Sequence, residues 1–407
     1  MRSRILLSVV AILIVAISCQ RADEKHKALR ERSAETLAES LNAAVNSPFD
    51  DFAPIISADG NLLYFTSNRE GGKGGQDVWY SHRAGGQWTP AQNLTELNTP
   101  SDEGLDTFRQ NGKSFYFTAD RPGGFGNNDI YMCRRSTKGW SQPENLGPEI
   151  NSSANDANAS LSADGKKLFF VSDRPGSMGG YDIWESDLGA DGKWSQPKNI
   201  GEPINTDGWE GNVFIAPDGM SLYFSSNGHG GFGGADVFRS VLRGGKWSEP
   251  ENMGDRINTS GNDTYFTIPG SGDLAYMSSS RPGGKGGEDI YAVPMPMLFA
   301  PKKIVVVTGN VLNKRTGAPM QAYVKVKYRP TRRDIASTVT RADGKFRVAF
   351  VPTDELMLMI YTDDKSVYPY YKSIPISMDQ NSQVIVRNVA MASGENPVET
   401  EEVNPKP

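Results

Sequence analysis

The chain has 407 residues, of which 37% are hydrophobic and 22% charged, and its formal net charge is −5. Acidic and basic residues are mixed along its length, so the charge pattern does not indicate nucleic-acid binding. The length allows more than one domain. The two cysteines are Cys19 and Cys133. If Cys19 is modified, no intrachain disulfide can form, and the chain must rely on its core for stability.

The N-terminal residues have the composition of an export signal. Arg2 and Arg4 precede a largely apolar run, Ile5 to Ile17. This run is too short to cross a bilayer, because a spanning helix needs about 20 residues. We therefore expect a signal peptide over residues 1–18.

The end of that signal, Ala16-Ile17-Ser18-Cys19, resembles the lipobox of bacterial lipoproteins. The resemblance implies that Cys19 is acylated and followed by a tether over residues 19–34. Gln20, rather than Asp, follows the cysteine, which favours the outer membrane on its periplasmic or cell-surface side. An ordinary secreted protein with a cleaved signal is the alternative.

A glycine-rich motif recurs five times with a period of 52 to 54 residues. Its copies are GGKGGQDVW from Gly71, GGFGNNDIY from Gly123, GSMGGYDIW from Gly176, GGFGGADVF from Gly230 and GGKGGEDIY from Gly283. A fixed period of this length is typical of repeat architectures, in which each repeat is one supersecondary unit.

Each repeat contains four short apolar runs separated by turn signals. In the third copy we expect strands at Ala159–Ser162, Leu168–Ser172, Asp182–Ser186 and from Trp194 to Ile200. Four short antiparallel strands make one propeller blade. The predicted fold class is therefore all-β, with a five-bladed β-propeller over residues 35–293.

The fifth repeat lacks a fourth strand of its own after Tyr291, because Pro294 and Pro296 interrupt it. We expect residues near Glu35 to Leu41 to supply that strand and close the ring, since closure removes exposed strand edges. When this segment is aligned with the fourth strands of the other repeats, Glu35 stands where those repeats have Trp.

A second domain follows the ring. Residues 294–302 form a proline-bearing linker, and residues 303–393 alternate apolar and polar residues in short runs, which predicts a small β-sandwich. The acidic residues 394–407 are expected to be disordered.

An arginine precedes the aspartate of the glycine motif by eight residues in four copies. We predict that these arginines and aspartates form structural loop pairs: Arg69 and Asp77, Arg121 and Asp129, Arg174 and Asp182, and Arg281 and Asp289. The alternative is a ring of charged loops that faces a partner. The fourth copy has Gly228 with His229 beside it, so Asp236 and His229 become candidate binding residues.

The glycine motif also resembles the calcium-binding nonapeptide of β-roll proteins. It is one residue longer and occurs once per repeat, so we expect no metal and take glycine to allow a positive φ in a tight loop. Four regularly spaced tryptophans are expected to pack between blades rather than to bind sugars: Trp88, Trp140, Trp194 and Trp247.

The runs of the type SADGxxLYFxS followed by RPGGxGxxDIY resemble the PD40 (WD40-like, TolB-type) propeller repeats between Leu41 and Val293. Thr316-Gly317-Ala318-Pro319 and Asp343-Gly344-Lys345-Phe346 are similar to a carboxypeptidase regulatory-like domain. Together with the lipobox, this is similar to Bacteroidota envelope lipoproteins of the OmpA family, including those associated with type IX secretion and gliding. Their OmpA-like domain has no counterpart here, so peptidoglycan binding is not implied.

The sequence indicates a binding protein rather than an enzyme. A second symmetric set of acids is expected to be structural: Asp51, Glu103, Asp156, Glu210 and Asp263. Asp102 and Asp106 are the acids left for chemistry, and the three histidines form no catalytic motif. We expect a non-catalytic envelope scaffold that contacts other envelope proteins and needs no cofactor. A carbohydrate-binding or carbohydrate-active propeller is the alternative.

Overall fold

The structure is a computed structural model of the whole chain. It describes residues 38–57, 60–108, 114–136, 139–269, 274–296, 298–301, 304–340, 343–350, 352, 355–375 and 382–400. The expected signal peptide, Cys19 and the tether lie outside the described residues. Within these ranges the regular secondary structure consists of strands. No helix long and apolar enough to cross a bilayer is found among the described residues.

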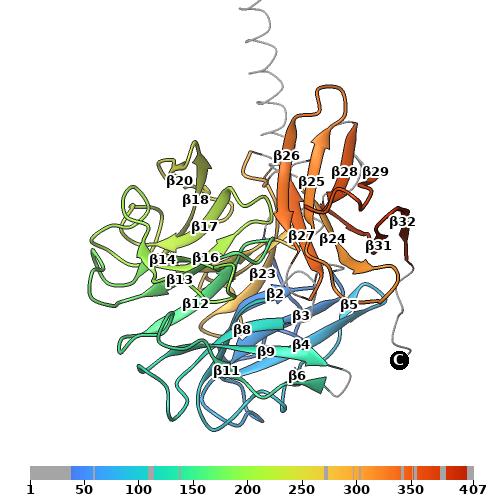
Figure 1. Cartoon of the computed structure of the whole chain (residues 1–407). Coiled ribbons are helices and arrows are strands. Elements are labelled where there is room, and N and C mark those ends of the chain that lie inside the picture. The colour runs from blue at the N-terminus through green and yellow to red at the C-terminus, as the bar shows by residue number, and fades with distance from the viewer. Residues whose placement is uncertain are drawn as a thin grey trace, which may run out of the picture.

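The fold is all-β, as expected. Five antiparallel sheets follow one another along the chain and form the larger lobe in Figure 1. Their long strands are β2 (Asp51–Ile56), β3 (Leu62–Ser67) and β4 (Asp77–Ala84); β7 (Glu103–Phe108), β8 (Ser114–Ala119) and β9 (Asp129–Ser136); β12 (Asp156–Leu161), β13 (Lys167–Ser172) and β14 (Asp182–Asp187); β16 (Glu210–Ile215), β17 (Ser221–Ser226) and β18 (Asp236–Arg243); and β21 (Asp263–Thr267), β22 (Leu274–Ser279) and β23 (Asp289–Pro294).

Short strands complete the outer edge of each sheet. They are β5 (Gln87–Trp88) and β6 (Gln92–Asn93), β10 (Gly139–Trp140) and β11 (Glu144–Asn145), β15 (Lys198–Asn199), β19 (Lys246–Trp247) and β20 (Glu251–Asn252), and β1 (Glu39–Ser40). The first strands of successive sheets contact one another in a closed cycle, from β2 through β7, β12, β16 and β21 back to β2. The sheets are therefore the five blades of a propeller around one axis.

The N-terminal segment closes the ring, as expected. Glu39 pairs with Ala292 and Ser40 with Tyr291, so β1 is the outer strand of the fifth blade. The Leu41 N–H donates to the Ile290 carbonyl at 3.0 Å. Glu35 lies outside the described residues, so the comparison of this residue with Trp is not tested.

A buried asparagine fastens each blade to the segment that follows it. Asn98 Oδ1 accepts the Val78 N–H at 2.9 Å, and Asn98 Nδ2 donates to the Val78 carbonyl at 2.8 Å. The same paired bonds join Asn151 to Ile130, Asn205 to Ile183, Asn258 to Val237 and Asn46 to Ile290. The last pair joins the start of the ring to its end.

The four regularly spaced tryptophans pack between blades, as predicted. Trp247 meets Phe169 of the preceding blade at 6.1 Å between centroids. Trp140 packs in a cluster with Ile55 and Tyr64 of the first blade, and Trp194 in a cluster with Tyr116 and Ile130 of the second. Trp88 lies in a cluster that includes Tyr276 and Ile290 of the fifth blade. These rings therefore contribute to the core rather than to an open site.

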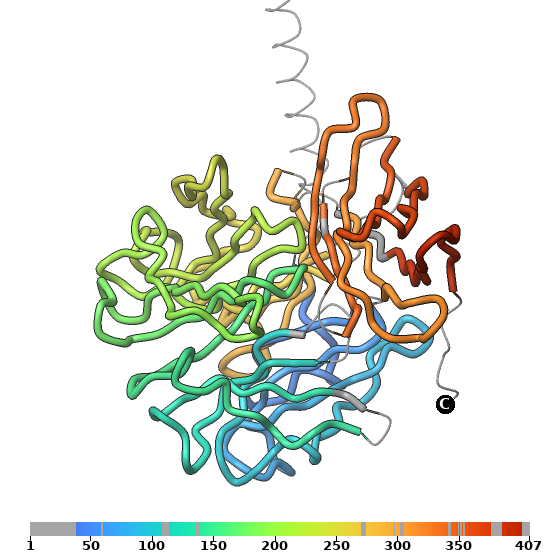
Figure 2. The backbone as a smooth tube through the Cα atoms, viewed as in Figure 1, coloured from blue at the N-terminus to red at the C-terminus, as the bar shows by residue number. Residues whose placement is uncertain are grey.

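The second lobe is a β-sandwich with one hydrophobic core. One sheet contains β27 (Lys345–Phe350), β24 (Ile304–Asn313), β31 (Val389–Ala392) and β32 (Glu395–Glu399), with β30 (Ser382–Val386) also paired to β24. The other contains β26 (Asp334–Val339), β25 (Tyr323–Tyr328), β28 (Leu356–Tyr361) and β29 (Tyr370–Ser373). Figure 2 shows this lobe, orange to red, beside the propeller.

The expectation of disorder from residue 394 is wrong for Glu395–Glu399, which form β32 against β31. Glu395 makes ion pairs with Lys314 and Arg315, and Glu399 pairs with Lys372. The acidic residues that suggested a solvated tail therefore meet basic residues of the sandwich. Residues 401–407 lie outside the described residues.

The sandwich contacts the propeller at the turn between β12 and β13. Arg347 Nε donates to the Ala163 carbonyl at 2.5 Å, and Lys166 Nζ donates to Thr338 Oγ1 at 3.2 Å. Val306 packs against Ala163. The glycine motifs lie at the opposite ends of the strands, where the second strand of each blade passes to the third. The two faces of the ring thus differ, and the sandwich occupies part of one of them.

Closure predicts a sharp effect of short N-terminal truncations. A chain that begins at Asn42 loses β1 and the buried Leu41, and should have a Tm lower by roughly 5 °C or more than a chain that begins at Ala38. The exposed edge of β23 should also promote association. Differential scanning calorimetry and light scattering measure both effects. Equal melting temperatures for the two chains would contradict closure by β1.

Candidate functional site

The aspartates of the glycine motif hold their own loops. Each carboxylate accepts the backbone N–H of the residue four positions earlier, as Asp129 Oδ2 does from Phe125 at 2.6 Å. The same bond links Asp77 to Lys73, Asp182 to Met178, Asp236 to Phe232 and Asp289 to Lys285. All five aspartates are buried, so their role in this structure is to shape the loop.

Three different constraints explain the glycines of the motif. The first glycine has a positive φ, as at Gly71, where φ is 90°. A Cβ on the second would collide with the aspartate, at 1.8 Å from Asp77 Oδ2 for Gly72. A Cβ on the third would lie 2.1 Å from the Ser101 carbonyl oxygen for Gly74. The glycines of the motif thus leave room for the backbone of the segment that enters the next blade.

The predicted pairing of the arginines is wrong. Arg69, Arg121, Arg174 and Arg281 pair with the second set of acids, Asp51, Glu103, Asp156 and Asp263, and not with Asp77, Asp129, Asp182 and Asp289. The side chains of those four acids are 0% exposed. Each of these acids begins a blade's first strand and lies beside the end of the second, whereas the loop aspartates are already bonded to backbone N–H groups.

The fourth blade keeps this arrangement without arginine. His229 Nε2 donates to the Ile204 carbonyl at 2.8 Å, the same bond that Arg174 makes to the Ile150 carbonyl at 2.5 Å. Glu210 is bonded by Ser226 and Thr206 instead. Asp236 is buried in its loop and His229 makes the bond that arginine makes in the other blades, so both residues have a structural role, and their part in binding stays a prediction.

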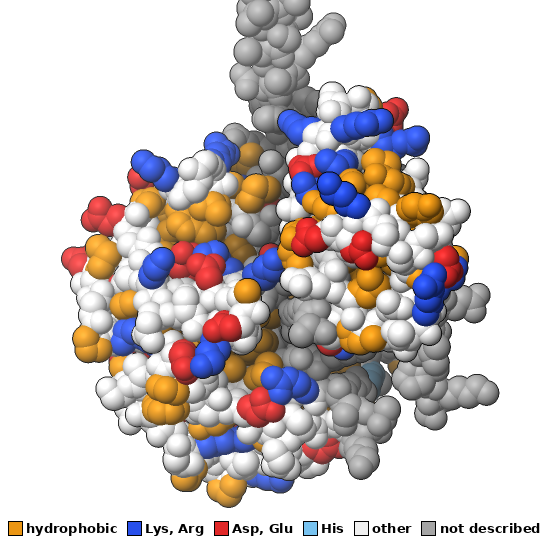
Figure 3. Space-filling model, viewed as in Figure 1, with side chains coloured by type: hydrophobic (Ala, Val, Ile, Leu, Met, Phe, Trp, Pro, Cys, Tyr) orange, Lys and Arg blue, Asp and Glu red, His pale blue; other side chains and the backbone are white. Residues whose placement is uncertain are grey.

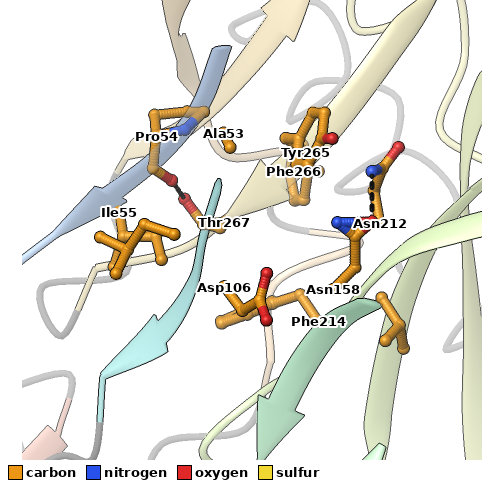
Figure 4. Close-up of a pocket in the computed structure, with 12 residues that line it drawn as sticks. Ala53, Pro54, Ile55, Asp106, Asn158, Asn212, Phe214, Tyr265, Phe266 and Thr267 are labelled. Atoms are coloured by element: carbon orange, nitrogen blue, oxygen red, sulfur yellow. Dashed lines mark hydrogen bonds between the residues drawn. The ribbon is translucent and has the colours of Figure 1, made fainter. Parts of the chain in front are cut away.

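The first strands of the blades surround a narrow neck on the propeller axis. A cavity of about 20 Å³ is lined by residues from all five of them, among them Ala53, Asp106, Asn158, Asn212 and Tyr265. Figure 4 shows these side chains around one space, with Asn212 Nδ2 donating to Asn158 Oδ1 at 3.3 Å. This volume holds about one water molecule and excludes a larger ligand.

Equivalent residues in four blades adopt a left-handed backbone conformation at this neck. Ala53, Asn158, Asn212 and Tyr265 all have φ of 51°. They lie where the pairing register between the first and second strands shifts, at β-bulges. β-Bulges change the direction of side chains and are frequent next to active sites. A tyrosine with a positive φ is uncommon. In the second blade the bulge falls one residue later, at Asp106.

Asp106 is the acid of the neck. Burial raises its pKa to about 7, although Thr118 and the backbone N–H groups of Ala159 and Asn158 bond to the carboxylate and lower the pKa. The Thr118 hydroxyl donates to it at 2.9 Å. Asp106 therefore lies on the axis, whereas the other acid singled out from the sequence, Asp102, accepts the Gln76 N–H at 2.8 Å in a contact between blades.

On the glycine-loop face the neck opens into a wider cavity of about 460 Å³, which we call the mouth. Asn158, Asn212 and Tyr265 line both spaces. The other residues of the mouth are Phe52, Ala157, Val171, Tyr181, Trp209, Asn227, Asn262, Thr264 and Glu288. The mouth thus combines aromatic rings, side-chain amides and one carboxyl, which suits recognition of a polar organic ligand.

Glu288 is the acid of the mouth. Burial and the neighbouring Asp50 carboxylate together raise its pKa to about 7. Asp106 does not line the mouth, so an open pair of carboxylates of the kind that glycosidases use is not formed by the described lining residues. The described residues contain no cluster of three or more His, Cys, Asp or Glu side chains that could hold a metal ion.

Sequence reasoning missed Tyr181, Trp209 and Glu288. All three lie at positions where the repeats differ from one another: Gln76, Asn128, Tyr181, Ala235 and Glu288 form one aligned set, and Asp50, Asp102, Asn155, Trp209 and Asn262 form another. Comparing repeats for departures rather than for identities would have found them. Asp102 does have counterparts in the other blades.

The revised pairing predicts that Arg174→Ala destabilises the protein by about 3–5 kcal/mol, because the buried Asp156 carboxylate is left without its cation. Arg134→Ala is the control: its pair with Glu144 is exposed, 55% and 52%, and should contribute about 0–1 kcal/mol. Urea denaturation gives both values. In double-mutant cycles, stronger coupling of Arg174 to Asp182 than to Asp156 would contradict the pairing.

The raised pKa of Asp106 predicts a pH-dependent stability. Its folded-state pKa lies above the unfolded value, so the folded state retains a proton that the unfolded state releases, and stability falls as pH rises from about 4 to about 7. Asp106→Asn should raise Tm by roughly 3 °C or more at pH 8 and leave it nearly unchanged at pH 4. An equal shift at both pH values would contradict the raised pKa.

No family model matches the chain, and no curated protein matches it. Solved structures that resemble it include TolB from Acinetobacter baumannii, with 15% identity, a TM-score of 0.38 and 63% of each chain covered, so the chain spans less than two thirds of that protein. An endo-arabinase from Bacteroides thetaiotaomicron has 14% identity and a TM-score of 0.40, with 64% of this chain and 98% of that chain covered. An alpha-L-arabinofuranosidase from Lactobacillus brevis has 11% identity and a TM-score of 0.40, with 63% and 92% covered. At these values the propeller assignment rests on the strand pairing of the chain itself.

Proposed function

We propose that the chain is a non-catalytic lipoprotein of the bacterial cell envelope that binds another envelope protein through the glycine-loop face of its propeller. The observation that carries the proposal is the exposure of large apolar side chains at the tips of three successive loops. Phe125, Met178 and Phe232 are 47%, 45% and 53% exposed at equivalent positions of the motif. We call these three residues the rim residues.

Three exposed apolar side chains at equivalent positions of one face offer apolar contacts to a partner. Lys73 and Lys285 stand at the same position in the other two blades, so the rim is apolar on one side and basic on the other. The sandwich contacts the ring at the turn between β12 and β13, away from these loops. On the view in Figure 3, acidic and basic side chains are intermixed, which fits a protein partner better than nucleic acid.

The distribution of acids supports a role without chemistry. Ten repeated carboxylates are buried: five are the aspartates of the glycine loops, and five begin the first strands of the blades. The mouth has one carboxyl, Glu288. A rigid closed ring can present loops at a fixed geometry without moving. Acylation of Cys19 would hold that ring at the outer membrane, and the family resemblance suggests a secretion or gliding machinery as the class of partner.

The proposal predicts one common contact for the rim residues. A photo-crosslinking residue placed at Phe125, Met178 or Phe232 of the full chain in cells should yield an adduct with the same envelope protein, identified by mass spectrometry. The control position is Tyr371, which is 51% exposed on the sandwich. Three unrelated adducts, or the same adducts from Tyr371, would contradict the proposal.

The membrane arm of the proposal has its own test. Cys19→Ser should abolish labelling by a palmitate analogue and move the chain from the outer-membrane fraction to the soluble fraction. Retention of both the label and the fractionation would show that Cys19 is not the anchor.

A second candidate, a carbohydrate-binding propeller, is favoured by the aromatic and amide side chains of the mouth. It concerns a different part of the glycine-loop face and is compatible with a protein partner at the rim.

A further inference from the structure

We infer that the mouth of the propeller is a binding site for a neutral oligosaccharide, with Trp209 and Tyr181 as its apolar wall and the amides of Asn227, Asn262 and Asn212 as its polar contacts. The inference deepens the carbohydrate candidate above and does not depend on the protein partner at the rim. The mouth, at about 460 Å³, is within the ordinary size range of small-molecule sites.

The first argument is a broken symmetry at the mouth. In the other blades, the residue that precedes the first-strand acid is polar and accepts a hydrogen bond from the preceding blade. Asp50 Oδ1 accepts the Glu288 N–H at 3.1 Å, and Asp102 Oδ1 accepts the Gln76 N–H at 2.8 Å. Asn262 Oδ1 accepts the Ala235 N–H at 3.0 Å. Asn155 Oδ1 accepts from Asn128 Nδ2 at 3.4 Å. Between the third and fourth blades, Trp209 stands in place of the polar residue and Tyr181 stands at the partner position, and both line the mouth.

The second argument is that the fourth blade is rebuilt around Trp209. A Cβ on Gly211 would lie 2.2 Å from an indole atom of Trp209, so glycine is required for the ring to lie over the first strand. The indole of Trp209 therefore packs directly over the backbone of the first strand.

The third argument is the set of unused hydrogen-bonding groups. Asn212 Oδ1 and Thr264 Oγ1 are buried without a partner in the described part of the chain, and both residues line the mouth. Asn227 and Asn262 use their Oδ1 atoms for backbone N–H groups. Their exposed Nδ2 groups donate to none of the described residues. Buried polar groups without partners are costly, which favours a ligand that supplies both donors and acceptors.

The fourth argument concerns charge. The lining residues of the mouth include no Lys, Arg or His and a single acid, Glu288, so an anionic ligand would be buried without a cation. The pKa of Glu288, raised to about 7 by burial and by Asp50, leaves this carboxyl partly protonated at neutral pH, which offers little to a cation. A ligand rich in hydroxyl groups, with apolar ring faces for Trp209, meets both requirements.

The test uses the mature full-length chain, calorimetric titration and tryptophan fluorescence. The probes are cellohexaose, xylohexaose, maltohexaose and arabinohexaose as neutral oligosaccharides, an oligogalacturonate as the acidic one and tetramethylammonium as a cation. At least one neutral probe should bind saturably, and the acidic probe and the cation should not. Binding of no neutral probe, or of the cation in preference, overturns the inference.

Variants locate the site. Trp209→Ala and Asn262→Ala should each weaken binding by about tenfold or more, and Trp209→Phe should retain most of it. Trp194→Phe, in the packing between blades, is the matched control and should leave affinity unchanged. Loss of the indole can destabilise the fourth blade, so the Tm of each variant is measured. The affinity of Glu288→Gln, a substitution on the fifth blade, tests the same site without removing the indole. Full affinity in both Trp209→Ala and Asn262→Ala overturns the site.

The outcome separates this inference from the protein-partner proposal. A Phe125→Ser, Met178→Ser, Phe232→Ser triple variant should bind the saccharide normally while no longer co-purifying with the envelope protein identified through the rim adducts. Loss of saccharide binding in that triple variant would overturn the placement of the ligand in the mouth.

Discussion

The ring depends on a buried asparagine amide that exchanges two hydrogen bonds with the backbone of the preceding blade. The amide acts as one more residue of strand pairing where the chain crosses from blade to blade, as Asn205 does with Ile183. Removing it would leave the buried Ile183 N–H without a partner, which costs more than the bond itself contributes, while the Ile183 carbonyl would keep the Ile200 N–H. The crossing segment then brings the next buried acid and the next first strand into place.

Because these contacts repeat, the ten buried carboxylates of the blades are committed to structure. The loop aspartates accept backbone N–H groups, and the acids at the blade starts meet arginines or hydroxyl groups. Function is therefore to be sought where one blade departs from the others. The departures gather in the fourth blade, where Gly228, Gly211 and Trp209 occur together, and at Glu288 in the fifth.

The period of the glycine motif predicted the number of blades, and the apolar runs within one repeat predicted the strand order. The missing fourth strand of the last repeat predicted closure by the N-terminal segment. Pairing was harder to predict, because Arg174 is eight residues from Asp182 in sequence but lies beside Asp156 only after the first two strands have paired. The fourth blade was identified as unusual, yet through Asp236 and His229, which are structural. The sequence could have identified Tyr181, Trp209 and Glu288 as departures from the repeat, but not their grouping, because the residues of the mouth come from four different blades and meet only in the folded ring.

The closing strand has a consequence for how the protein is made. Glu39 and Ser40 are translated before any blade exists, but their partners Tyr291 and Ala292 leave the ribosome some 250 residues later. Over that interval the first blade has no neighbour on one side, and Asn46 has no backbone to bridge. Contacts so distant in sequence form slowly because a long loop must close first. The final joining of the two ends is therefore the step at which a nascent ring is most exposed to mispairing with another chain.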